Sequence, residues 1–222
     1  MKIITIIFCI AYVAVTICYL FSETSENFPR RVINKVILAT MFLCYGFSAY
    51  ALNYEVKSWH ILFMIALVFS WLGDVVLLYD FTIGGILFII GNLTFFAYSI
   101  LLTVDMNIAF LKMCWIIPVF IVLWGAMFIV SGKKKLDFGK QRPALLAYLF
   151  SVTLHGTMGL GLAVNAPDVK TLVFGLGLVL FMISDYFLMT HKFGYPKSKT
   201  LLRCNSSTYF IGLMLIVISM SF

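Results

Sequence analysis

The chain has 222 residues, of which 63% are hydrophobic and only 11% carry a charge. A soluble domain carries about 25% charged residues, so this sequence has too few to cover a water-facing surface. The net charge of +7 could suggest a nucleic-acid partner, but the Lys and Arg residues lie mainly at the ends of apolar runs and in two connecting segments. Retention of positive charge on the cytoplasmic side of a membrane explains that placement. We therefore expect an integral membrane protein that binds no nucleic acid.

Eight apolar runs are long enough to cross the hydrocarbon layer, which takes about 20 helical residues. They cover residues 3–21, 33–52, 59–79, 83–103, 108–130, 143–164, 170–190 and 207–222. The first run is longer than the roughly 7–15 residues of a signal-peptide core, so we interpret it as a spanning helix. No connecting segment is long enough to separate two domains. The predicted fold is all-α, a single domain over residues 1–222 with eight transmembrane helices.

The distribution of basic residues predicts the orientation. Twelve of the sixteen Lys and Arg residues lie in or beside the segments that follow the first, third, fifth and seventh spans, and four lie on the other side. Positive charge is retained in the cytoplasm. We therefore expect a multi-pass protein with both termini outside the cytoplasm, in the cell membrane if the source is bacterial.

The five cysteines indicate neither a disulfide framework nor a zinc site, because they show no Cys-x-x-Cys spacing and lie in or beside apolar runs. They are Cys9, Cys18, Cys44, Cys114 and Cys204. We interpret them as small packing residues. The sequence predicts no metal and no cofactor.

Asp74 and Asp185 are the acidic residues inside the predicted spans. A carboxylate loses its water there, so by default it marks a functional site. Each lies about five residues before a cytoplasmic segment, roughly 8 Å inside the boundary, so the two are expected to meet. Close carboxylates cannot both ionise cheaply, and such a pair shares a proton and can supply a general acid and a general base. A packing or capping role for each acid is the alternative.

A weak internal repeat supports the pairing. Asp74 and Asp185 are 111 residues apart, and each follows a small residue and precedes a Leu by three positions. The same offset relates Arg31 to Arg142. We expect two four-helix halves related by an axis along the membrane normal, with the acids at their interface. Chance similarity between two apolar segments is the alternative.

Other polar residues in the spans are further candidates. Lys35 lies one turn inside the second span, where it could hold a lipid phosphate, offset the acids or extend to the interface. Asn92 and His155 lie in the fourth and sixth spans, where a lone polar residue most often bonds a neighbouring helix. Tyr148 and Tyr209 are either interface residues or donors in the site.

The sequence resembles the YhhN-type lysoplasmalogenase family of eight-span membrane proteins over nearly the whole chain. The resemblance rests on the run from Leu72 to Leu78 around Asp74, and on the run from Leu180 to Asp185 followed by Leu188. Supporting features are Lys35 opening the second span, Gly85 to Gly91 in the fourth, Pro143 with Tyr148 in the sixth, and Thr208-Tyr209 opening the eighth.

The resemblance implies a metal-independent ether hydrolase that cleaves the vinyl ether bond of a lysoplasmalogen into a fatty aldehyde and a glycerophospho-alcohol. Asp74 and Asp185 would then be catalytic, and the substrate-binding residues would be Lys35, Asn92, Tyr148 and Tyr209. Four positions depart from the family pattern. Family members often carry Pro, His, Tyr and Gln where this chain has Val36, Asn92, Phe95 and Leu213.

Other classes of function fit parts of the sequence. A proton-coupled small-molecule transporter would also use intramembrane acids and a two-fold repeat. An intramembrane aspartyl protease pairs acids on two helices, although the Ser184-Asp185 context differs from those enzymes. A purely structural membrane protein leaves both acids unexplained. The oligomeric state, the headgroup preference and the assignment of acid and base stay open at this level.

Overall fold

The computed structural model of the chain describes residues 2–23, 28–52, 57–133, 136–194 and 198–222, and nearly all of them are helical. Eight helical stretches among these residues are long and apolar enough to cross a membrane. The helices are α1 (Lys2–Glu23), α2 (Phe28–Leu52), α3 (Ile61–Val76) preceded by the 3-10 turn η1 (Ser58–His60), α4 (Phe81–Asp105), α5 (Phe110–Met113), α6 (Ile116–Val130), α7 (Arg142–Val164), α8 (Val169–Phe193) and α9 (Lys199–Ile218). The predicted all-α polytopic fold is confirmed.

Short elements complete the described chain. Two-residue strands, β1 (Gly132–Lys133) and β2 (Leu136–Asp137), pair antiparallel between α6 and α7. The 3-10 turns η2 (Gly139–Gln141) and η3 (Ser219–Ser221) precede α7 and follow α9. These elements lie at the ends of the spanning helices and add no further layer to the fold.

Side chains at the helix starts explain where several spans begin. The Asp80 carboxylate accepts hydrogen bonds of 2.8 and 2.9 Å from the backbone N–H groups of Thr82 and Ile83 at the start of α4. Asp168 likewise accepts a 2.7 Å bond from the backbone of Thr171 at the start of α8. An acidic N-cap satisfies backbone donors that have no partner within the helix, so both helices begin beside an Asp.

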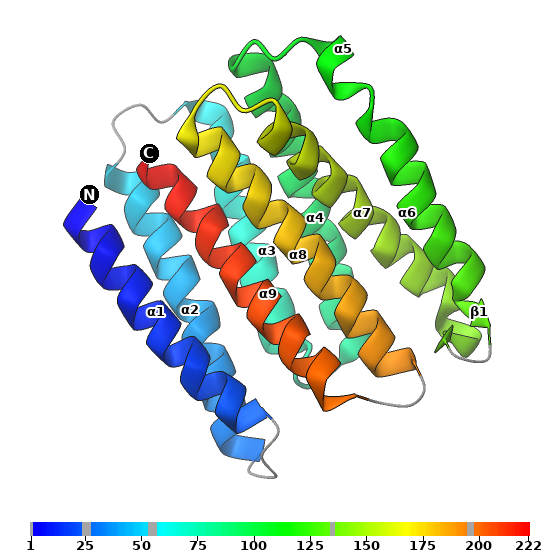
Figure 1. Cartoon of the computed structure of the whole chain (residues 1–222). Helices are drawn as coiled ribbons and strands as arrows, with labels where there is room; N and C mark the ends of the chain where they lie inside the picture. The colour runs from blue at the N-terminus through cyan, green and yellow to red at the C-terminus, as the bar shows by residue number, and fades with distance from the viewer. Residues whose placement is uncertain (1, 24–27, 53–56, 134–135, 195–197) are drawn as a thin grey trace.

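The spanning helices form two layers (Figure 1). The order in one layer is α1, α9, α8, α7 and α6, while α2, α3 and α4 lie behind it, and both chain ends lie at one end of the molecule. Aromatic rings from α3, α4, α8 and α9 fill the space between the layers. They belong to Phe63, Phe88, Phe95, Tyr98, Phe174, Phe181 and Tyr209.

Both halves of the chain pack in the same order. In the first half α1 packs on α2, α2 on α3 and α3 on α4; in the second, α6 packs on α7, α7 on α8 and α8 on α9. Between the halves, α4 packs on α7 and α9 packs on α2. These two contacts are the ones that a two-fold relation would exchange, so the packing order agrees with the predicted repeat.

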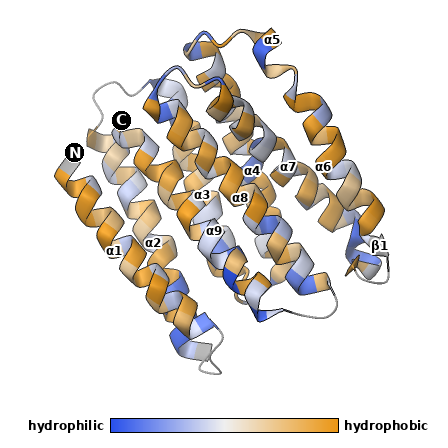
Figure 2. Cartoon of the chain, viewed as in Figure 1, coloured by the Kyte–Doolittle hydropathy of each residue, from blue (hydrophilic) through white to orange (hydrophobic). Residues whose placement is uncertain are grey.

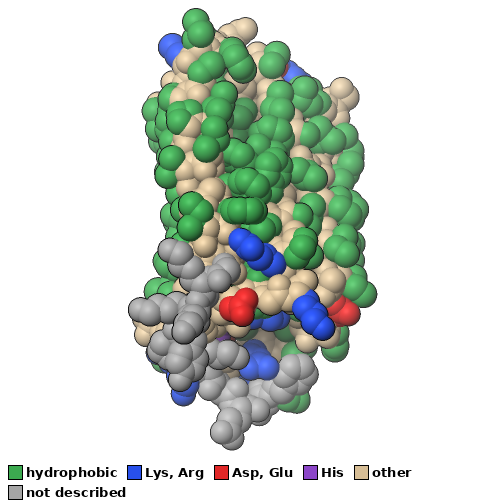
Figure 3. All heavy atoms as spheres, turned by 90° about the vertical axis from the view of Figure 1, so that its right-hand side faces the viewer, with side chains coloured by type: hydrophobic (Ala, Val, Ile, Leu, Met, Phe, Trp, Pro, Cys, Tyr) green, Lys and Arg blue, Asp and Glu red, His purple; other side chains and the backbone are tan. Residues whose placement is uncertain are grey.

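The surface is apolar along the spans. Figure 2 shows hydrophilic residues mainly near the helix ends, and Figure 3 shows one face covered by apolar side chains with the Lys, Arg, Asp and Glu side chains near its two ends. This distribution suits a hydrocarbon environment. Which end faces the cytoplasm stays a prediction. The predicted orientation depends on the basic residues, and three of them lie outside the described residues: Lys134, Lys135 and Lys197.

Two helices differ most from the predicted spans. Helix α9 begins at Lys199 rather than at 207, because Ser198 caps it through a bond to the backbone N–H of Leu201 and the polar residues that follow continue the helix. The predicted fifth span is divided into the short α5 and the longer α6. Helix α6 has no buried residue, whereas α7 beside it is the most enclosed of the spans.

Candidate functional site

Asp74 lies in the last turn of α3 and is only 2% exposed. Its Oδ2 accepts a 2.7 Å hydrogen bond from the hydroxyl of Tyr209 on α9, and its Oδ1 lies 3.2 Å from Nζ of Lys35 on α2. The Lys35 side chain is 14% exposed, so this ion pair is largely withdrawn from solvent. Buried charges are found paired and hydrogen-bonded, and Asp74 meets both conditions.

Asp185 lies in α8 and is 4% exposed. The hydroxyl of Tyr148 on α7 interacts with its carboxylate. The geometry lies outside normal hydrogen-bond limits, because neither the Tyr148 hydroxyl nor Oδ2 of Asp185 has a hydrogen-bond partner within the described chain. Asp185 also interacts electrostatically with Asp74 and Lys35. The two acids, the lysine and Tyr148 therefore belong to one group.

The two acids do not lie at matched distances from the helix ends, as the sequence suggested. Asp74 is two residues before the last residue of α3, Val76, while Asp185 is eight residues before the last residue of α8, Phe193. The difference arises because α3 ends in a turn before the predicted boundary and α8 continues beyond it. The carboxylates still come within electrostatic range of each other.

Asn92 on α4 and His155 on α7 each contact Ser151 on α7, apart from the two acids. Asn92 is fully buried, and its Nδ2 lies 3.4 Å from the hydroxyl of Ser151. His155 is also fully buried, with Nδ1 3.2 Å from the backbone oxygen of Ser151. Oδ1 of Asn92 and Nε2 of His155 have no hydrogen-bond partner in the described parts of the chain. The structure thus gives Asn92 a partner on a neighbouring helix, and a contact between Asn92 and substrate stays a prediction.

Glu23 is a third buried acid that the sequence analysis placed in a connecting segment. It is the last residue of α1 and is 4% exposed. Its Oε1 accepts hydrogen bonds from the hydroxyls of Tyr19, at 3.3 Å, and of Ser206. Glu23 also interacts electrostatically with Lys35 and Arg203. The i, i+4 spacing of Tyr19 and Glu23 was the available signal, since it continues the first span by two residues.

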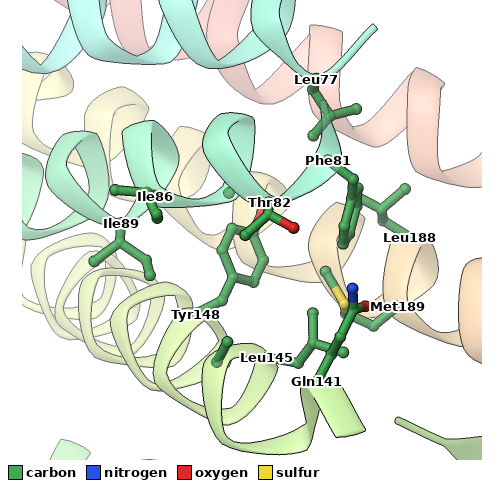
Figure 4. A pocket seen from close by; sticks show the side chains of 12 residues that line it. Leu77, Phe81, Thr82, Ile86, Ile89, Gln141, Leu145, Tyr148, Leu188 and Met189 are labelled. Atoms are coloured by element: carbon green, nitrogen blue, oxygen red, sulfur yellow. The ribbon is translucent and has the colours of Figure 1, made fainter. Parts of the chain in front are cut away.

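A cavity of about 170 Å³ adjoins the Asp185 side of the group. It lies between the end of α3, the first half of α4, the start of α7 and the end of α8, and its lining is mostly apolar. In Figure 4 the ring of Tyr148 extends from α7 toward Thr82 on α4, with Phe81 and Leu188 on another side of the space. Tyr148 therefore connects the cavity to Asp185.

The site offers two carboxylates, one ammonium group and two phenols in a mostly apolar environment. Carboxylic acids and phenols can donate and accept protons, and such groups act as general acids and bases when they lie beside a reacting molecule. Within the described residues, no three His, Cys, Asp or Glu side chains are placed to hold a metal ion.

The fold and the site together define a polytopic membrane protein with a buried carboxylate pair drawn from two of its spanning helices. Comparison with protein families matches residues 31–220 to the YhhN family, and the chain belongs to that family. The match leaves α1 outside it. No curated protein and no solved structure matches the sequence.

Proposed function

We propose that this protein is a membrane-embedded hydrolase that cleaves the vinyl ether bond of lysoplasmalogens. The observation that carries the proposal is a pair of buried carboxylates, Asp74 and Asp185, whose charges interact, with Tyr148 between Asp185 and an apolar cavity. Vinyl ether hydrolysis requires one group that gives a proton to carbon and one that assists water, and two carboxyl groups suffice for both tasks. Membership of the YhhN family and the resemblance of both Asp motifs to its lysoplasmalogenases agree with this reaction.

The chemistry assigns a step to each carboxyl group. A protonated carboxyl gives its proton to the alkene carbon farther from the ether oxygen, which leaves an oxocarbenium cation. The other carboxylate stabilises this cation and takes a proton from the water that adds to it. The resulting hemiacetal breaks its bond to the glycerol oxygen, which receives that proton. The hemiacetal hydroxyl returns a proton to the first carboxyl group, and a fatty aldehyde leaves.

The surroundings favour Asp185 as the proton donor and Asp74 as the carboxylate. Oδ2 of Asp185 is free of hydrogen-bond partners in the described structure, and Tyr148 beside it lines the cavity. Asp74 has its charge balanced by Lys35 and one oxygen held by Tyr209. A fixed negative charge suits stabilisation of a developing cation, because it needs no reorganisation during the reaction.

The remaining predicted contacts follow from this assignment. Lys35 balances the charge of Asp74 and, with Arg31, offers positive charge to the substrate phosphate at the same end of the helices. In this proposal Tyr148 and Tyr209 orient the two carboxyl groups. Asn92, which follows the cavity-lining Ile89 on α4, bounds the site on the side farther from the helix ends. The protein uses no metal and no cofactor in this proposal.

Aldehyde release from a defined lysoplasmalogen by the purified protein in detergent tests the proposal. Wild type should produce aldehyde, and it should leave the matching lysolipid with a saturated alkyl ether intact, since that compound has no alkene to protonate. Asp74→Asn and Asp185→Asn should each abolish turnover. Asp105→Asn is the matched control, because Asp105 pairs with Lys57 at the opposite end of the helices.

A folded wild-type protein that releases no aldehyde would contradict the hydrolase, as would near-normal turnover in both Asp variants. Proton-coupled transport is the second candidate function. The observation that favours it is the shared packing order of the two halves around the acid pair, which is typical of repeat-built transporters. Substrate uptake coupled to a pH change in vesicles, lost in both Asp variants, would identify it.

A further inference from the structure

A second apolar pocket lies next to the cavity beside Tyr148. Gly85 and Ile89 on α4 line the cavity, and Ile89 also lines a second pocket that reaches Leu93. Trp124 on α6 lies on the far side of the second pocket, and α7 forms its floor. The two pockets are neighbours, because Ile89 lines both, and together we call them the chain groove.

We propose that the chain groove binds the single hydrocarbon chain of the lysolipid substrate. The vinyl ether lies beside Tyr148 and Asp185, and the chain runs past Ile89 toward Trp124. This proposal rests on the proposed function, because it places the reacting bond at the carboxyl pair. Its own support is the position of Tyr148 in the cavity, the adjacency of the two pockets at Ile89, the length of the groove and the charge at its mouth.

The length of the groove fits one chain from one leaflet. Gly85 and Leu93 are eight residues apart on α4, which corresponds to about 12 Å at 1.5 Å per residue. One leaflet contributes about half of the hydrocarbon thickness of about 30 Å. A third pocket, of about 400 Å³, is lined by Ile100 and other residues toward the far end of α4. This pocket begins at Phe96, about 16 Å from Gly85 along the helix, so it lies past the middle of α4, in the half of the hydrocarbon layer that belongs to the other leaflet.

In addition to Lys35 and Arg31, the mouth of the groove offers the substrate phosphate a further cation, Lys192. Nζ of Lys192 lies 3.1 Å from the centroid of the Phe81 ring, and Phe81 lines the cavity. Lys192 follows Asp185 by two helical turns, about 10 Å along α8. The polar side chain of Gln141 also lines the cavity. The order of cation, carboxyl group and apolar path matches the order of phosphate, vinyl ether and chain in a lysolipid.

Two glycines provide a matched pair of variants. A Cβ added at Gly85 meets nothing within 4 Å, and the same holds at Gly125 on α6. Both positions therefore have room for a Cβ, and thermal unfolding in detergent checks that each Phe variant is folded. Gly85 lines the cavity, whereas Gly125 lines none of the three described pockets. Gly85→Phe fills the groove, and Gly125→Phe makes the same chemical change outside it.

Binding is measured without turnover by fluorescence quenching of Trp124. This indole is fixed in the groove by a 3.2 Å hydrogen bond from Nε1 to the backbone oxygen of Leu146. The probe is an alkyl-ether lysolipid with a nitroxide at mid-chain, and Trp124→Phe identifies the signal that belongs to this residue. We expect saturable quenching in wild type and in Gly125→Phe, and its loss in Gly85→Phe.

Saturable quenching that persists unchanged in Gly85→Phe would overturn the proposal. So would equal quenching by a double-chain lipid with the same label, because the occupant would then be an ordinary membrane lipid. In the aldehyde assay, Gly85→Phe should raise KM at least tenfold for every chain length. Ala147→Phe, which lies in the second pocket, should raise it for long chains only.

The two proposals fail separately. If wild type releases no aldehyde but shows saturable quenching that depends on Gly85, the lipid site stands and the hydrolase is wrong. If wild type releases aldehyde and Trp124 shows no saturable quenching, the hydrolase stands and the chain groove is wrong.

Discussion

Asp74 and Asp185 occupy corresponding places in the two halves of the chain, yet their surroundings differ. Each is met by a side chain from the preceding spanning helix of its own half, Lys35 for Asp74 and Tyr148 for Asp185. Asp74 is also held by Tyr209 from the last helix of the other half, whereas Oδ2 of Asp185 has no partner among the described residues. The carboxylate of this motif is therefore held by two partners in the first half, whereas in the second half it lies behind Tyr148, which lines the cavity.

The outer helices of the two halves, α1 and α6, also differ in how closely they are packed. Helix α1 packs on α9, but the corresponding helices α6 and α4 border the chain groove. The buried Glu23 at the end of α1 accepts a hydrogen bond from Ser206 on α9, which stabilises the contact between these two helices. The two halves therefore share one packing order but differ at their outer helices. The contact of α1 with α9 stabilises the fold, whereas the groove between α6 and α4 gives access from the membrane.

The largest expected effect separates activity from stability at Asp185. Asp185→Asn should lower kcat by about 10²- to 10⁴-fold, the usual contribution of a general acid. Its unfolding free energy should stay the same or rise, because a buried carboxyl without a paired cation is replaced by a neutral group of similar shape. Aldehyde release and thermal unfolding in detergent measure the two quantities. Substantial residual turnover would remove Asp185 from the proton-donor role.

Asp74→Asn should lose activity and also stability. It leaves the Lys35 ammonium largely buried without its partner, and breaking a buried ion pair costs about 3–5 kcal/mol. The double variant Lys35→Met with Asp74→Asn should recover most of the stability and none of the activity, because both charges are then removed together. Equal stability of Asp74→Asn and Asp185→Asn would contradict the distinction between the carboxylate held by two partners and the carboxylate behind Tyr148.

The two tyrosines test the same distinction with one hydroxyl each. Tyr209→Phe removes a 2.7 Å bond to a carboxylate and should cost about 1.5–3 kcal/mol of stability. Tyr148→Phe removes a buried hydroxyl that has no hydrogen-bond partner in the described structure, so stability should stay the same or rise. Its kcat should still fall, since this hydroxyl lies between Asp185 and the cavity. Unfolding in denaturant measures the stability of both variants, and steady-state kinetics measures kcat. A larger loss of stability in Tyr148→Phe than in Tyr209→Phe would contradict the prediction.

The sequence predicted the eight spans and identified the two acids inside them because both depend on local pattern. Apolar length defines a span, and a carboxylate inside one stands out. The sequence did not predict that Asp74 forms an ion pair with Lys35. From the sequence alone the Lys35 side chain could equally extend to the membrane interface, and only the packing of α2 on α3 brings it to Asp74. Glu23 was missed because the first apolar run ends before it, and its burial depends on contact with α9.

Glu23→Gln should have the smallest effect. The amide keeps an acceptor for Tyr19 and Ser206 but loses the charge, so stability should fall by about 1 kcal/mol. Turnover should change by less than about threefold, because Lys35 still has Asp74 as its ion-pair partner. Glu23→Ala, which removes the acceptor as well, should destabilise further with the same small change in kcat. Since α1 lies outside the residues matched to the YhhN family, a tenfold loss of kcat in Glu23→Gln would mean that this chain has added a third acid to its catalytic group.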